Sequence, residues 1–156
     1  MKRIDKTIDY KGYTVHIFRG LPDSNDLNLD QEIKIKISKT GENIRGELIL
    51  RPLWIFDEDE NDDPDFAYKL KYQTGDYFQQ TFNSNPKRQG IASILHDFII
   101  DHKNDCDLNN IFSTNSDEDE YGITIEANSF WEKRVSLDKD EKDETLNRFK
   151  IKFPTS

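Results

Sequence analysis

The sequence has one cysteine, Cys106, among its 156 residues, so no internal disulfide is possible and a reducing, intracellular environment is expected. Long apolar runs are also missing. None approaches the ~20 residues that a membrane-spanning helix requires, and the first residues contain no apolar segment of signal-peptide length. These absences predict a cytoplasmic protein with no membrane partner.

Basic residues are outnumbered, because Lys plus Arg is 22 and Asp plus Glu is 31, which gives a formal net charge of −9. A nucleic-acid partner requires a basic face, so we expect no nucleic acid. An acidic surface attracts cations, and the sequence therefore favours a positively charged partner. The alternative, an acidic binding protein that mimics nucleic acid, rests on the charge alone.

Metal-binding patterns are incomplete. The string Asp57–Asp65 spaces its oxygen ligands like a calcium loop, but the position that requires glycine holds Asp62 and the position that requires a bidentate glutamate holds Tyr68. The histidines His96 and His102 lack the i, i+4 spacing of a shared ligating face. We expect no metal, and we interpret Asp57–Asp65 as a solvated loop or as the rim of a site for a cationic acceptor.

Alternation of apolar and polar residues predicts half-buried strands in the first part of the chain and at its end. The alternating segments are Tyr13–Ile17, Ile33–Ile37, Phe66–Tyr72 and Phe149–Phe153. The segment Gly46–Phe56 is more continuously apolar, which predicts an inner strand with a bend at Pro52. Hairpin turns are expected at Lys39–Asn43 and Gln73–Asp76, with a further strand at Tyr77–Phe82.

Helical periodicity replaces alternation in the last part of the chain. An apolar stripe predicts an amphipathic helix that starts near Arg88 and is formed by Ile91, Ile94, Leu95, Phe98 and Ile99. A short strand within Asn109–Asn115, a second helix at Ile125–Val135 and an acidic linker at Ser136–Glu144 complete the pattern. We expect a single domain over residues 1–156, of the α+β class with a mixed α/β sheet, in which an antiparallel meander precedes helix, strand, helix and strand.

The segment "KRQGIA", from Lys87 to Ala92, lies between a predicted strand and this helix. A glycine there allows the backbone to approach a ligand closely, and the free N–H groups of a first helical turn bind anions. The cations Lys87 and Arg88 add positive charge beside it. The segment matches neither the Walker pattern nor the Gly-x-Gly-x-x-Gly pattern of dinucleotide sites. A phosphate-binding loop and a simple turn between strand and helix are the two interpretations.

The same segment resembles the acetyl-CoA loop of the GNAT N-acetyltransferase superfamily, whose pattern is Q/R-x-x-G-x-G/A. Gly90 and Ala92 fall on the last two fixed positions, and Lys87 occupies the first. The later segment "EANSFWEKRV" resembles the family's A-x-x-F-Y-E-K, with Ala127 and Phe130 in register. The resemblance covers Tyr77–Val135, a little over a third of the chain.

The resemblance implies a GNAT-like fold and a transfer of the acetyl group from acetyl-CoA, by direct attack of an amine in a ternary complex. The acceptor is expected to be a cationic amine or a protein lysine. The strand "YFQQTF" would be the splayed strand that pairs with the pantetheine arm. The residues expected to bind acetyl-CoA are Phe82, Lys87, Arg88, Gln89, Gly90, Ile91, Ala92 and Ser93.

The catalytic residues follow less directly from the resemblance. Trp131 occupies the position where the family carries the tyrosine that protonates the CoA thiolate, which leaves Tyr121 as the candidate acid. Glu47, on an inner strand, is the candidate general base, and the alternative is a surface glutamate. Between its first two strands the family has two helices that shape the acceptor pocket, whereas this chain has only Gly20–Gln31 there. The acceptor site is therefore the part of the family's site that the resemblance predicts least. A non-catalytic GNAT-like interaction module is the alternative function.

Overall fold

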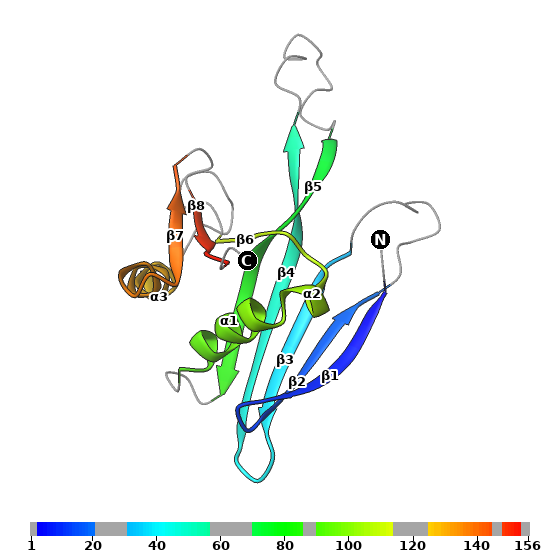
Figure 1. Cartoon of the computed structure of the whole chain (residues 1–156), viewed down its shortest axis with the longest axis vertical. Coiled ribbons are helices and arrows are strands. Elements are labelled where there is room, and N and C mark those ends of the chain that lie inside the picture. The colour runs from blue at the N-terminus through cyan, green and yellow to red at the C-terminus, as the bar shows by residue number, and fades with distance from the viewer. Residues whose placement is uncertain are drawn as a thin grey trace.

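The computed structural model describes residues 3–20, 31–56, 70–85, 90–113, 125–144 and 148–153, which form an eight-stranded mixed sheet with three helices (Figure 1). The elements in chain order are β1 (Ile4–Tyr10), β2 (Tyr13–Arg19), β3 (Ile33–Lys39), β4 (Ile44–Phe56), β5 (Leu70–Asn85), α1 (Ile91–Asp101), α2 (Lys103–Cys106), β6 (Ile111–Phe112), α3 (Ile125–Ser136), β7 (Asp140–Asp143) and β8 (Arg148–Ile151). The strand order is β1-β2-β3-β4-β5-β6-β8-β7. The expected mixed sheet, mostly antiparallel, is confirmed.

Strands β1 to β5 form an antiparallel meander with one buried face. In β3 the isoleucines Ile33, Ile35 and Ile37 are buried, whereas Lys34 and Lys36 point to the other face. The register pairs Ile35 with a core residue on each neighbouring strand. Because side chains alternate across a strand, this single pattern separates a core face from a polar face.

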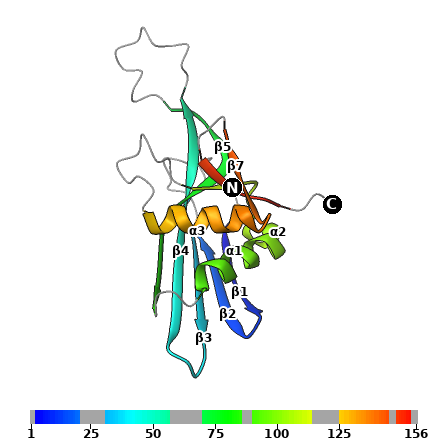
Figure 2. The same ribbon diagram turned by 90° about the vertical axis from the view of Figure 1, so that its left-hand side faces the viewer.

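Helix α1 covers the core face with the stripe expected from its periodicity. Ile91, Leu95, Phe98 and Ile99 are all buried. Figure 2 shows α1 and α2 on one side of strands β1 to β4. Gly46 of β4 permits the close approach, because a Cβ atom at this position would lie only 2.8 Å from Ile91 Cγ2.

The C-terminal elements join the meander through a short strand. Strand β6 is parallel to β5 over two residue pairs, and β8 lies between β6 and β7. Ser113 strengthens the junction between β6 and β8. Its N–H donates to Phe149 O at 2.8 Å, and its Oγ accepts from Phe149 N–H at 3.0 Å. The ring of Trp131 stacks on Phe149, with 6.0 Å between ring centroids, and attaches α3 to this part of the sheet.

Two sequence-based predictions are wrong. Gln73–Asp76 is not a turn but part of β5, because pairing with β4 continues on both sides through a bulge, from Pro52↔Tyr77 to Trp54↔Gln73. The segment Ser136–Glu144 is not only a linker, since it contains β7, which pairs with β8. The alternation also failed to predict β1, an edge strand that a turn with positive φ at Lys11 and Gly12 connects to β2.

Other predictions fall outside the described residues. These are the acidic string Asp57–Asp65, the loop residues Lys87, Arg88 and Gln89, and the candidate acid Tyr121. Among the helices that the structure describes, none is both long enough and apolar enough to cross a membrane.

Candidate functional site

Strand β6 is short, and both of its residues pair with β5. The parallel pairs are Tyr77↔Ile111 and Phe78↔Phe112. Within the described residues, no strand pairs with this edge of β5 between Gln79 and Asn85. Among the described residues this edge of β5 has no strand partner beyond Phe78, and the backbone N–H and C=O groups of such an edge pair readily with an added extended chain.

A β-bulge in β5 lies just beyond the residues that pair with β6. Ile49 pairs with Thr81 and Leu50 pairs with Gln79, so Gln80 has no opposite residue in β4. A bulge bends the strand and turns backbone groups out of the regular ladder. It lies directly after Phe78, the last residue of β5 that pairs with β6. The irregular part of β5 therefore begins where its pairing with β6 ends.

Helix α1 begins near the end of β5. Gly46 lies opposite Ser84 of β5, and the space above Gly46 is filled by Ile91, the first residue of α1. The exposed Gly90 is the N-cap, with φ 69° and ψ 15° and no side-chain hydrogen bond. Its carbonyl accepts the first helical bond, from Ile94 N–H at 3.1 Å. The amides that follow Gly90 thus belong to the first turn, whose N–H groups have no intrahelical partner.

The need for glycine at position 90 is conformational. A Cβ atom on Gly90 would meet nothing within 4 Å, so space does not select glycine here. A positive φ is the left-handed conformation, which costs an L-residue roughly 1–2 kcal/mol. Gly90 therefore sets the direction in which the chain enters α1.

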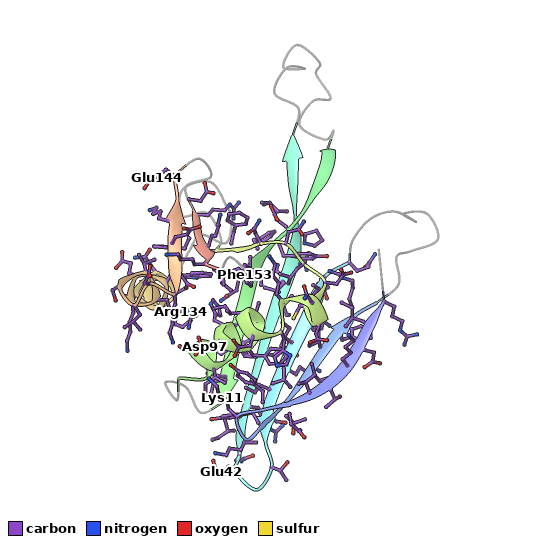
Figure 3. The ribbon with its side chains drawn as sticks, in the orientation of Figure 1. Lys11, Glu42, Asp97, Arg134, Glu144 and Phe153 are labelled. Atoms are coloured by element: carbon purple, nitrogen blue, oxygen red, sulfur yellow. The ribbon has the colours of Figure 1, made fainter. Side chains whose placement is uncertain are left out.

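Ser93, one turn into α1, is bound to α3. Its Oγ accepts from Arg134 Nη1 at 2.9 Å, and its carbonyl oxygen lies 3.3 Å from the same nitrogen. Arg134 is buried and also donates to Asp97 Oδ1 at 3.2 Å and to Asp140 Oδ2 at 3.0 Å. Arg134 and Asp97 face each other between the two helices (Figure 3). The guanidinium group therefore holds α3 and β7 against α1.

His96 extends this cluster to β5. Its ring is 1% exposed, its Nε2 lies 2.8 Å from Gln79 Oε1, and the rings of Phe130 and Trp131 pack against it. Burial, assisted by the charge of Arg134, lowers the pKa of His96 well below 6.5, so the ring is neutral. Sequence reasoning missed this role of His96, although its place beside the apolar stripe of α1 is a signal for burial.

Asp140 completes the cluster from the first position of β7. The residue is 2% exposed. Burial raises its pKa from 3.8 to about 6, and the neighbouring Arg134 acts in the opposite direction. An aspartate in the polar string "DKDEKDE" gives no sequence signal of burial, because only the fold distinguishes it from its exposed neighbours.

A second buried arginine fixes the middle of β5. Arg19 Nη2 donates to Tyr77 OH at 2.7 Å and to Asp107 O at 2.9 Å, and Nη1 donates to Asp107 Oδ2 at 3.1 Å. These bonds tie the end of β2 to the start of the paired region of β5 and to the turn after α2. They hold the chain that leads into β6.

Of the two predicted catalytic residues the structure describes only Glu47, since Tyr121 lies outside the described residues. Glu47 is half-buried on the face of the sheet opposite to α1, and its Oε2 lies 3.6 Å from Lys36 Nζ. Trp131 is a core residue of α3 and is 1% exposed. Phe82 lies on β5 and packs, half-buried, against the core, and Gly90 is the N-cap of α1. Of the residues expected to bind acetyl-CoA, the structure describes Phe82 and the segment from Gly90 to Ser93.

In the described part of the chain, no group of three or more His, Cys, Asp or Glu side chains is arranged to hold a metal ion. Comparison with known protein families, with curated proteins and with solved structures finds no match.

Proposed function

We propose that this protein is a GNAT-like N-acetyltransferase, which transfers the acetyl group of acetyl-CoA to a primary amine. The observation that carries the proposal is the bulge of β5 just beyond its short pairing with β6, on the strand that precedes a helix whose first turn follows Gly90. A splayed strand followed by a phosphate-binding helix start is the arrangement that the "KRQGIA" resemblance implies. The two features were inferred from different residues, and their proximity in the fold supports the proposal.

The pyrophosphate of CoA would bind at the start of α1. The N–H groups of Gly90, Ile91 and Ala92 and the positive end of the helix dipole favour an anion there. Lys87, Arg88 and Gln89 would supply charge and hydrogen bonds from the preceding loop. Ser93 would contribute through its backbone only, because its hydroxyl is bound by Arg134.

The pantetheine arm would pair with the free edge of β5 beyond Phe78, beside Phe82. Near the bulge at Gln80, a backbone amide would donate to the thioester carbonyl oxygen and stabilise the charge that develops there. The amine nitrogen attacks the carbonyl carbon, the carbon–sulfur bond breaks, and CoA leaves as a thiolate. Holding both reactants in one complex supplies much of the acceleration.

Two proton transfers complete the reaction. Glu47 would accept the proton of the attacking amine, directly or through water, from the face of the sheet opposite to α1. Tyr121 would protonate the CoA thiolate, because Trp131 is an indole that packs in the core and has no acidic hydroxyl. The net charge of −9 favours a cationic acceptor, either a small amine or a protein lysine. A cytoplasmic location is part of the proposal and rests on the single cysteine.

Titration calorimetry of CoA against wild-type protein and two glycine variants tests the binding site. Gly90→Val should abolish CoA binding, because a β-branched residue cannot hold the positive φ that aims the first-turn amides. Gly41→Val is the matched control, since Gly41 has φ 81° in the β3–β4 turn and no atom within 4 Å of a Cβ. The control should bind CoA like the wild type. Absence of wild-type binding at millimolar CoA would mean that the loop is only a turn between strand and helix.

A GNAT-like interaction module without catalysis is the second candidate. The observation that favours it is the burial of Trp131 at the position of the family's tyrosine. Release of CoA from acetyl-CoA in the presence of a polyamine, or of a lysine-containing peptide, separates the candidates. Binding of CoA without release for any primary amine supports the interaction module, and release that depends on the amine supports the enzyme.

A further inference from the structure

Two hydrogen-bond acceptors face each other in the core between α1 and β7. The amide oxygen of Gln79 can only accept, so the 2.8 Å contact places the hydrogen of His96 on Nε2 and leaves Nδ1 with a bare lone pair. His96 Nδ1 lies 4.0 Å from Asp140 Oδ2. Nδ1 and Asp140 Oδ1 are both buried without a hydrogen-bond partner. An unsatisfied buried polar group is costly, and two acceptors side by side also repel each other.

The charges around the pair permit a proton between them. Arg134 on α3 donates to Asp140 Oδ2, but it also bonds to Asp97 on α1, which supplies a compensating negative charge. Lys139, in the turn before β7, lies 3.5 Å from Asp97 and is 42% exposed, so solvent screens its charge. The other side of the His96 ring meets aromatic rings. Asp140 can therefore be neutral without leaving Arg134 unpaired.

We propose that His96 and Asp140 hold one proton between them in the folded protein, carried by the Asp140 carboxyl group toward His96 Nδ1, and that this proton joins the α3–β7 segment to α1. A carboxyl group donates where a carboxylate only accepts, so a proton on Asp140 Oδ1 directed at His96 Nδ1 gives both unsatisfied atoms a partner. The oxygen 4.0 Å from Nδ1 is Oδ2, which accepts from Arg134 Nε, so the carboxyl group has to turn to bring Oδ1 toward Nδ1. The proposal does not depend on the proposed acetyltransferase activity.

The proton changes its residue when the chain folds. Between about pH 4 and pH 6 the unfolded chain carries the proton on His96, because the unfolded pKa values are 6.5 for histidine and 3.8 for aspartate. In the folded protein the pKa of Asp140 is about 6 and that of His96 is well below 6.5, so the carboxyl group carries it. Each state binds one proton, and the pair therefore adds no pH dependence to folding over this range.

Single substitutions of His96 and Asp140 should make the folding equilibrium depend on pH in opposite directions. In His96→Gln the raised pKa of Asp140 remains, because burial causes it, and the equilibrium constant for folding should rise up to roughly a hundredfold from pH 7.5 to pH 4. In Asp140→Asn the lowered pKa of His96 remains, and the constant should fall as the pH drops below 6.5. The double variant should lose both effects.

Urea unfolding of each variant across this pH range measures these slopes relative to the wild type. His16→Gln is the control, because His16 is an exposed histidine 2.7 Å from Asp5 and is far from the cluster in the sequence and on another strand. It should not produce the rise expected for His96→Gln. Slopes of the same sign in the two single variants, or a double variant that keeps either slope, would overturn the proposal.

NMR of the wild-type protein gives a test that does not depend on variants that fold. At pH 5 the side-chain carboxyl ¹³C signal of Asp140 should have the shift of a protonated acid and should move near pH 6. The ¹⁵N signals of His96 at pH 5 should show a neutral ring with its hydrogen on Nε2. An ionised Asp140 or a protonated His96 at pH 5 would refute the shared proton.

Discussion

Replacing Gly46 by alanine tests how closely the start of α1 packs against the sheet. A Cβ atom at this position would lie 2.8 Å from Ile91 Cγ2 and 3.0 Å from Ile37 Cγ2. Both neighbours are buried core residues, so neither can move into solvent. The variant must shift the first turn of α1 or force a side chain out of its rotamer.

The sign of the change in the free energy of unfolding shows whether a Cβ atom fits at position 46. Glycine inside a strand is less stable than alanine by roughly 0.5–1 kcal/mol, so without a clash the variant would be more stable than the wild type. Inserting a methyl group into a filled core costs about 1–3 kcal/mol. Taken at their midpoints, the two effects predict that Gly46→Ala lowers the free energy of unfolding by about 1 kcal/mol, with an upper bound of about 2.5 kcal/mol.

Urea denaturation with linear extrapolation measures this change, and an unchanged m-value confirms that it reflects stability alone. A double-mutant cycle with Ile91→Ala locates its origin. Ile91→Ala alone should cost about 2–5 kcal/mol, and it should cost less when Gly46→Ala already fills part of the cavity. An alanine variant as stable as the wild type would refute the close packing of Ile91 on Gly46.

Three further outcomes are expected. Arg134→Met should destabilise the protein by about 3 kcal/mol or more in urea unfolding, because it removes a buried cation that bonds to Ser93, Asp97 and Asp140; a loss below 1 kcal/mol would contradict the bridging role. Arg134→Lys should recover little of that stability, since an ammonium group cannot bond to all three partners in the geometry of the guanidinium fork. Cys106, whose pKa burial raises to about 12, should react with a disulfide reagent at pH 8 far more slowly in the folded protein than in urea, and equal rates would show that it is accessible.

Regular periodicity predicted those elements that bury one face. Strand β3 and helix α1 have strict apolar patterns, and both lie in the core as expected. Strand β7 could not be predicted in this way, because its sequence Asp-Glu-Lys-Asp has no apolar face and it is held by backbone pairing with β8. The prediction of a turn at Gln73–Asp76 was wrong for a related reason. These residues lie at a β-bulge whose position depends on the pairing of β5 with β4.

The sequence also predicted part of the candidate site. The apolar stripe predicted a helix that starts near Arg88, and the structure begins α1 at Ile91, after the N-cap Gly90. The cluster of Gln79, His96, Arg134 and Asp140 was not foreseen, because its members come from β5, α1, α3 and β7 and meet only in the folded chain. Local patterns carry no information about which polar residue a distant element will bury.

The two-pair junction between β5 and β6 has a consequence for local opening. In the described part of the chain, strand pairing joins β7 and β8 to the meander through β6, which pairs with β5 at two residue pairs, whereas β3 is paired along its length with both β2 and β4. Sub-global opening breaks the smallest set of contacts first. The backbone amides of β7 and β8 should therefore exchange their hydrogens with deuterium together, and earlier than those of β3, as one cooperative unit at the C-terminal end of the sheet.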